Sequence, residues 1–251
     1  MFAFHRPETL AAWVQERESL RGRWQTTHPG KKYPEPTPVD TTNLPDLSKG
    51  WVWTSIEQLA NVLGGLTKNA KRGMLPLQMS YLRVANVYAN ELKLDNVEMI
   101  GIQESELERV LLEKGDLLVV EGNGSVDQIG RVALWNDSIS PCVHQNHIIK
   151  VRFAEKNIAD FVLYWLLSPN GRKEIQRVAS STSGLYTLSL SKVSALPVPL
   201  PPLAEQQRIV AEVERRLSVI ATLEQTLTAN LARADRLRQS ILHRAFSGRL
   251  V

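Results

Sequence analysis

An uninterrupted helical pattern near the C-terminus constrains this chain more than any other feature. From about residue 203 to residue 246, apolar residues recur at steps of three or four, with no glycine or proline between them. A helix of this extent would be roughly 65 Å long at about 1.5 Å per residue. The repeating positions are Ile209, Val213, Leu217, Ile220, Leu223, Leu227, Leu231, Ala234, Leu237, Ile241 and Ala245.

Such a helix exposes an apolar stripe to water unless another element covers it. One interpretation is a core helix of a larger bundle, but the rest of the chain is too small to cover this length. The pattern therefore favours pairing of the helix with a helix of another chain.

Proline-rich stretches divide the remainder of the chain. Residues 197–202 hold four prolines directly before the long helix, and residues 26–49 hold five prolines with few apolar residues. Repeated prolines fix the backbone and remove amide donors, so these stretches predict a stiff boundary and an extended linker. We expect four parts: an N-terminal helical segment at 1–25, a linker at 26–49, a compact domain at 50–200 and the long helix at 201–251.

The compact domain contains both helical and strand patterns. Ser55, with Gln58 three residues later, predicts the start of a helix that ends at Gly64 and Gly65. Short apolar runs bounded by turn residues predict strands at 82–85, 117–120, 132–135 and 147–151, and helical patterns follow at 159–168 and 172–179. The predicted fold class is therefore α+β: a globular mixed domain followed by a long helix.

Charge and cysteine content restrict the setting only loosely. The net charge is +4 and the sequence pI is about 9.2, which permits an anionic partner without requiring one. Cys142 is the single cysteine, so no intramolecular disulfide can form. This fits a protein of the reducing cytoplasm, where disulfides are rare. There is no secretion signal and no apolar run near the roughly 18 residues of a membrane helix, so we expect a cytoplasmic protein without a membrane segment.

Enzyme motifs are sparse. No phosphate-binding loop and no Asp/Asn-Pro-Pro-aromatic motif of adenine methyltransferases is present. Asp46 with Glu91 and Lys93 matches the acidic residue plus Glu-x-Lys motif of metal-dependent nucleases. Asp46 lies in the expected linker, however, and such a short pattern also arises by chance.

Two further groups could be read as reactive sites. Cys142, His144 and His147 are residues that zinc favours, but a structural site needs four ligands, and on a strand His147 would point away from the other two. The hydroxyl-rich residues 180–186 lack the surroundings of a serine nucleophile and are simpler to interpret as a turn or a phosphate-contacting loop. We therefore expect no catalytic residue and no metal site.

Several stretches resemble one known family. The junction Pro199-Leu-Pro-Pro-Leu-Ala-Glu-Gln-Gln-Arg-Ile209 is the most specific of them, and residues 44–53, 81–87, 114–125 and 241–251 add to it. Over roughly residues 44–251 the chain resembles the specificity subunits of type I restriction–modification systems. Residues 8–38 resemble the segment after the first conserved helix of a two-domain subunit. This chain has one recognition domain and one long helix, so it is either the C-terminal half of a longer protein or a separately encoded half-subunit.

The resemblance implies a function and a set of partners. It implies a sequence-specific DNA-binding subunit that recognises one half of a bipartite site in double-stranded DNA, with its long helix paired as an antiparallel coiled coil in a homodimer or with a second specificity half. A modification subunit would use S-adenosylmethionine to methylate adenine. A restriction subunit would use ATP and Mg to translocate and cleave DNA. This chain itself would need no cofactor.

Three loops carry the cationic, amide and hydroxyl groups that DNA binding uses, namely residues 67–72, 122–131 and 180–186, and three further residues could lie nearby. Each of these residues can also be interpreted as a solvated surface residue. The candidate DNA contacts are Lys68, Asn69, Lys71, Arg72, Arg83, Asn123, Ser125, Gln128, Arg131, Gln145, Asn146, Ser183 and Tyr186.

Three alternative functions stay open on the sequence. The chain could be the DNA-recognition module of another methylation system, such as a type IIG-like enzyme. It could be a coiled-coil scaffold that does not touch DNA, or a metal-dependent nuclease that uses Glu91 and Lys93. Salt-dependent DNA binding separates the scaffold from the others, because phosphate contacts weaken steeply with salt.

Overall fold

The structure is a computed structural model that describes residues 18, 21–22, 25–26, 29–30, 35–36, 38–182 and 184–249. The helical segment expected at residues 1–25 lies largely outside these residues. The chain divides into two compact units between Gln206 and Gln207.

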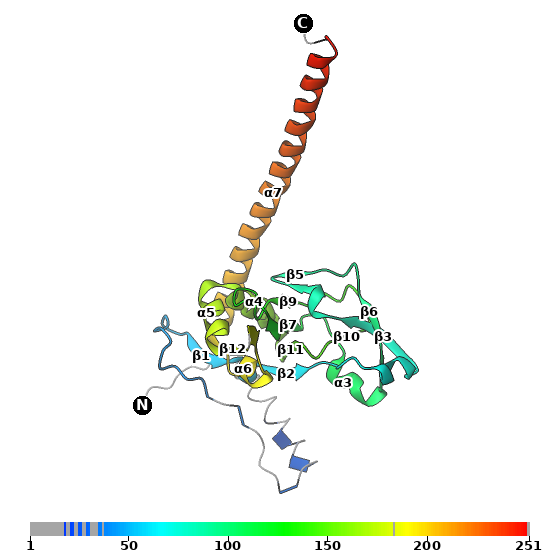
Figure 1. Cartoon of the computed structure of the whole chain (residues 1–251). Helices are drawn as coiled ribbons and strands as arrows, with labels where there is room; N and C mark the ends of the chain where they lie inside the picture. The colour runs from blue at the N-terminus through cyan, green and yellow to red at the C-terminus, as the bar shows by residue number, and fades with distance from the viewer. Residues whose placement is uncertain are drawn as a thin grey trace. The chain divides into compact units, whose positions relative to one another are not determined.

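The first unit is built on two main sheets (Figure 1). An antiparallel sheet has the strand order β2-β11-β7-β9, and a mixed sheet has the order β10-β3-β6 with β10 parallel to β3. The strands of these sheets are β2 Ala60–Gly64, β3 Leu77–Leu82, β6 Glu98–Ile102, β7 Leu117–Val120, β9 Val132–Leu134, β10 Cys142–His144 and β11 Ile148–Phe153.

Smaller sheets complete the strand set of this unit. Strands β1 and β14 pair antiparallel, β4 pairs with β5, and β12, β13 and β8 form a three-stranded sheet. Their bounds are β1 Val52–Ser55, β4 Val87–Tyr88, β5 Glu91–Leu92, β8 Gly122–Asn123, β12 Ser180–Thr182, β13 Leu185–Thr187 and β14 Pro197–Leu200.

Short helices connect the strands, and α4 packs on both β9 and α5 (Figure 1). Ser168 caps α5 by accepting a hydrogen bond from the Gly171 N–H at 3.1 Å, and Pro169 occupies the first helical position. The helices are α2 Ile56–Leu59, η1 Ala70–Met74, η2 Val84–Asn86, η3 Glu104–Glu106, α3 Leu107–Val110, η4 Lys156–Ile158, α4 Ala159–Leu167, α5 Pro169–Val178, α6 Leu190–Ser194 and α7 Leu203–Phe246.

The mixed sheet lies between two apolar clusters, because its side chains alternate between its faces. Leu82 and Cys142 belong to one cluster, around Trp135. Their neighbours Tyr81 and Val143 belong to the other. Burial on both faces fixes β3 and β10 firmly, and with them the turn that follows β10.

Several sequence predictions agree with the structure. The helix expected at 203–246 is α7, the strand expected at 117–120 is β7, and β9, β11, α4 and α5 lie within one to three residues of their predicted bounds. The α+β class with a long C-terminal helix is confirmed.

Two local predictions are wrong. The strand expected at 82–85 stops at Leu82, because the Asn86 side chain accepts a hydrogen bond from the Arg83 N–H at 2.9 Å and closes a 3-10 turn. The helix expected after Ser55 lasts one turn, although Gln58 does accept from the Ser55 N–H at 2.9 Å. The chain then enters β2, which pairs with β11, so tertiary pairing overrides the local helical signal.

Helix α7 carries exposed apolar side chains at its repeating positions. Leu223 is 63% exposed, and Leu227 and Leu231 are each 60% exposed. Glu212 forms ion pairs with Arg215 and Arg216 on the same helix at 2.9 and 2.6 Å. Pairing of this helix stays a prediction. No helix in the described ranges is both long and apolar enough to cross a membrane.

Candidate nucleic-acid interface

The turn between β10 and β11, residues 145–147, is a point where several segments converge. The Leu66 carbonyl accepts from the Asn146 N–H at 2.9 Å, and the Leu82 carbonyl accepts from the Gln145 N–H at 2.9 Å. The His147 carbonyl accepts from the Glu121 N–H at 2.9 Å. Segments that are far apart in sequence therefore meet around this turn.

A glycine and a buried histidine hold the turn in place. A side chain at Gly65 would overlap the carbonyl oxygens of His144 and Gln145, so only glycine allows this close approach. The Ile148 carbonyl lies 2.9 Å from Nδ1 of His144, and a carbonyl can only accept, so Nδ1 carries the proton. Burial, followed by the nearby charge of Lys150, lowers the pKa of His144 to about 3, and the imidazole is neutral.

The side chains of the turn form a polar chain at the surface. Gln145 Oε1 accepts from the Val84 N–H at 3.1 Å. Asn146 Nδ2 lies 3.3 Å from His147 Nε2, and His147 Nδ1 lies 3.0 Å from Glu121 Oε2. Side-chain amides and carboxylates are among the groups that read donors and acceptors on base edges in the major groove, and an imidazole can likewise donate and accept hydrogen bonds.

The second and third predicted loops lie side by side. Strand β13 pairs with both β8 and β12, which places Tyr186 opposite Asn123. Asn123 Oδ1 accepts from the Ser125 N–H at 2.9 Å. The structure therefore brings Asn123, Ser125 and Tyr186 together, and Gln128 is exposed on the same loop. Ser183 lies outside the described residues.

Helix α5 fixes the backbone of the second loop. Arg172 donates to the carbonyls of Gly130 and Asp127 at 3.0 and 3.1 Å. Gln176 donates to the Val126 carbonyl at 3.4 Å. The backbone of this loop is therefore held by side chains of α5 as well as by hydrogen bonds within the loop.

The first predicted loop is more heavily tied to the protein. Arg72 is only 15% exposed; it pairs with Glu106 at 2.7 Å and lowers the pKa of that carboxyl to about 2. Its guanidinium also donates to the Thr67 carbonyl at 2.9 Å. The Asn69 side chain caps η1 by accepting from the Arg72 N–H at 3.2 Å. Arg72 and Asn69 therefore stabilise the fold of the first loop through contacts within the protein.

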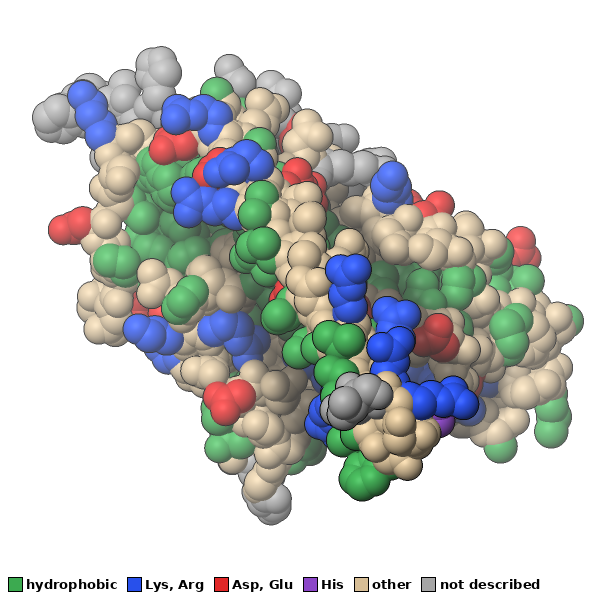
Figure 2. Space-filling view, turned by 90° about the horizontal axis from the view of Figure 1, so that it is seen from above, with side chains coloured by type: hydrophobic (Ala, Val, Ile, Leu, Met, Phe, Trp, Pro, Cys, Tyr) green, Lys and Arg blue, Asp and Glu red, His purple; other side chains and the backbone are tan. Residues whose placement is uncertain are grey.

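Glu98 joins two other candidate cations. Lys68 and Arg83 pair with its two carboxylate oxygens at 2.5 and 2.6 Å. Lys71 is exposed and makes no ion pair within the described ranges. In Figure 2, Lys and Arg side chains lie in separate groups with Asp and Glu side chains among them. The face in view therefore has several small positive patches rather than one continuous positive surface.

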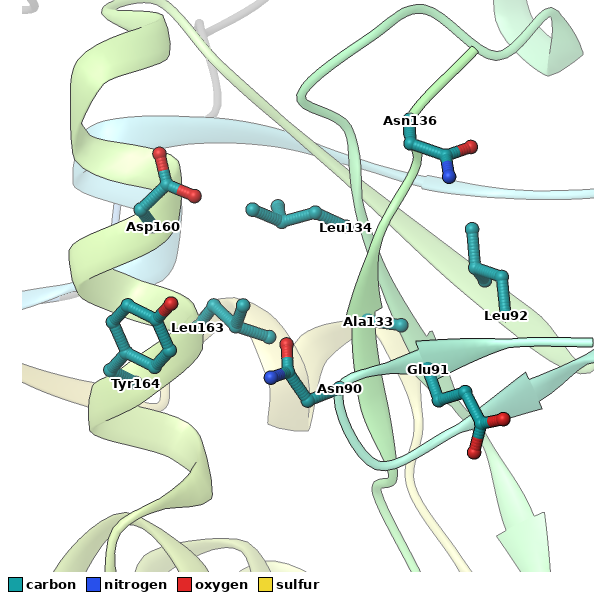
Figure 3. A pocket seen from close by; sticks show the side chains of 9 residues that line it. All are labelled: Asn90, Glu91, Leu92, Ala133, Leu134, Asn136, Asp160, Leu163 and Tyr164. Carbon is teal, nitrogen blue, oxygen red and sulfur yellow. The ribbon is translucent and has the colours of Figure 1, made fainter. Parts of the chain in front are cut away.

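A pocket of about 210 Å³ lies beside the β4–β5 hairpin (Figure 3). Asn90, Glu91 and Leu92 come from the hairpin, and Asp160 and Tyr164 come from α4. Burial raises the pKa of Asp160. Neither this pocket nor the rest of the described chain gathers three or more His, Cys, Asp or Glu residues that could hold a metal ion.

Glu121 and His147 are not among the residues predicted from the sequence as DNA contacts. The sequence pattern groups His147 with Cys142 and His144 as residues that zinc favours, and it gives no sign of a partner for Glu121. Their shared contact across 26 residues could not be derived from spacing alone. Cys142 is buried, and burial raises its pKa to about 12.

Comparison with known proteins gives a consistent result. The family model of the type I restriction modification DNA specificity domain matches residues 48–233. The chain is 32% identical over 174 residues to the type I restriction enzyme EcoKI specificity subunit of Escherichia coli (strain K12), covering 67% of this chain and 37% of the relative. It is 30% identical over 203 residues to the StySPI specificity subunit of Salmonella potsdam, covering 80% of this chain and 43% of the relative.

The fold has a match among solved structures. A chain from a structure described as the basis of complex assembly and conformational transition of the type I R-M system aligns with a TM-score of 0.61 at 19% identity. The alignment covers 97% of this chain and 57% of that chain. The present chain thus spans well under two thirds of the length of these relatives.

Proposed function

This chain belongs to the family of type I restriction modification DNA specificity domains, and from this premise we propose that its folded domain reads one half of a split target site in double-stranded DNA. Specificity subunits are non-catalytic. Reading a target therefore has to come from binding alone, through base edges and phosphates.

The observation that carries the proposal is the convergence on the 145–147 turn. Gln145, Asn146, His147 and Glu121 lie within one hydrogen-bonded set, beside the paired strands β8 and β13 that hold Asn123 and Tyr186. The turn is anchored by buried strands, so its side chains are presented on a rigid support. A surface of this kind suits direct readout in the major groove.

DNA binding by the full chain tests this proposal. We expect affinity for a mixed-sequence duplex to fall steeply with salt in a fluorescence anisotropy titration. Asn146→Ala should reduce discrimination between sequences, whereas Gln103→Ala, which removes an exposed amide outside the turn, should not. Salt-independent or absent binding would favour the scaffold alternative, and sequence reading with a different catalytic partner would favour a type IIG-like module.

We further propose that α7 pairs as an antiparallel coiled coil with a second specificity half or a second copy of this chain. The repeated exposed leucines support this pairing, because an uncovered apolar stripe of this length is costly in water. Two copies related by a two-fold axis would read a palindromic split site. Leu227→Pro should abolish the dimer in light scattering; a variant of unchanged mass would contradict the pairing.

The partners follow from the family. We propose that a modification subunit supplies S-adenosylmethionine-dependent adenine methylation and that a restriction subunit supplies ATP- and Mg-dependent translocation and cleavage, in the cytoplasm. Co-purification with a modification subunit tests this part. Recovery of the chain without that subunit, under conditions where both are folded, would contradict it.

A further inference from the structure

Two cationic side chains share one aromatic ring beside the 145–147 turn. Lys93 Nζ lies 4.4 Å from the centre of the Tyr88 ring, and Arg131 Cζ lies 4.9 Å from the same centre. Tyr88 is on β4, Lys93 follows β5, and Arg131 precedes β9. Cation–π contacts hold both long side chains against the same ring, so the two charged groups are no more than about 9 Å apart.

No carboxylate in the described part of the chain forms an ion pair with either of these two cations. Lys68 and Arg83, in contrast, are both paired with Glu98. Arg131 Nε is buried without a hydrogen-bond partner among the described residues, and Nη2 makes one long hydrogen bond, of 3.4 Å, to the Val84 carbonyl. The guanidinium thus keeps most of its five donors unused.

The position of the pair connects it to the proposed reading surface. Val84, whose carbonyl accepts from Arg131, donates its own N–H to Gln145 Oε1 at 3.1 Å. Arg131 also ends the second predicted loop, and its carbonyl accepts from the Val120 N–H at 2.9 Å. An anion bound between Lys93 and Arg131 would therefore lie next to the turn.

We propose that Lys93 and Arg131, positioned by the Tyr88 ring, bind one backbone phosphate of the DNA. This inference rests on the proposed DNA-reading function. Arginine offers a fork of donors to phosphate oxygens and lysine adds a point charge. Two long, flexible cations without a carboxylate partner, held against one ring, can both reach a single oxyanion. The phosphate contact fixes the register of the duplex, while the 145–147 turn contacts the bases.

The test is a salt titration of DNA affinity with the full chain and a mixed-sequence duplex. The double variant Lys93→Gln/Arg131→Gln should weaken binding to every sequence alike and flatten the plot of log affinity against log salt by about 1. Lys173→Gln, which removes an exposed charge on α5, is the matched control and should leave the slope unchanged.

The ring is tested separately. Tyr88→Phe keeps the aromatic face and should bind as the parent does, whereas Tyr88→Leu should lose affinity. Circular dichroism of each variant establishes that it is folded under the conditions of the DNA titration. If the Tyr88 and Lys93/Arg131 variants unfold at lower temperature but keep the parental slope of log affinity against log salt, the three residues only stabilise the β4–β5 hairpin. The proposed phosphate site is then wrong.

The outcomes separate the two proposals. A parent chain that binds no DNA overturns the proposed function, and the phosphate site with it. A parent that binds with a steep salt dependence, together with unchanged Lys93 and Arg131 variants, overturns the phosphate site alone. A slope change of about 2 in the double variant would assign the cations to two phosphates and contradict the shared site.

Discussion

Acidification should destabilise the domain through His144. This side chain is fully buried, and its Nε2 makes no hydrogen bond within the described residues. Protonation would place a charged N–H in an apolar site beside Lys150 and Arg109, both of which disfavour it. The folded state therefore binds this proton only near pH 3, whereas the unfolded chain binds it near the ordinary value of 6.5.

The magnitude follows from linkage. Because the pKa of His144 is lower in the folded state, its contribution to stability is complete above pH 6.5 and is lost as the pH falls toward 3. Each pH unit within that window is worth about 1.4 kcal/mol, so moving from about pH 7 to about pH 5 should cost about 2 kcal/mol. Glu106 does not add to this loss, because its pKa is lowered from 4.5 and it acts only at lower pH.

Urea unfolding followed by circular dichroism at several pH values measures the effect. The parent chain should lose about 2 kcal/mol between about pH 7 and pH 5, and His144→Asn should lose much less. His243→Asn, on α7, removes an exposed histidine and should behave as the parent does. Equal losses in the parent and in His144→Asn would refute the assignment, whatever the absolute stability of the variant.

Three further changes have expected outcomes. Gly65→Ala should destabilise the domain by about 1–3 kcal/mol or more in urea unfolding, because its methyl group would overlap backbone, while Gly124→Ala meets no atom within 4 Å and should be nearly neutral. Arg152→Met should cost about 3–5 kcal/mol in the same assay, because it leaves Asp116, which is 2% exposed, without its ion pair at 2.7 Å; a loss below 1 kcal/mol would contradict this. Arg172→Gln should free the backbone of residues 127–130 and speed its amide hydrogen exchange, and unchanged exchange would show that the loop holds itself.

The long helix and the buried strands could be predicted because their signals are local. Helix α7 has an apolar period and no breaker, and β7 is a run of apolar residues between turn residues. Strand β14 was missed because Pro197 and Pro199 indicate a break. The two prolines are two residues apart, so their nitrogens face the same edge, and among the described strands β14 pairs only with β1.

The candidate site could be predicted only as a set of loops. The sequence selected Gln145, Asn146 and Tyr186, and the structure brings their segments together through β-pairing that spacing does not reveal. It also selected Arg72, whose partner Glu106 lies 34 residues away. Whether a cation is free or paired depends on such distant contacts, which a single sequence does not show.

Selection from a random pool of DNA duplexes tests the central claim most directly. The full chain is bound to the pool at moderate salt, and the retained duplexes are sequenced. We expect enrichment of a short motif, a broader motif with Asn146→Ala, and the same motif at lower recovery with Lys93→Gln/Arg131→Gln. Retained duplexes with the same sequence composition as the starting pool would contradict the claim that this domain reads DNA.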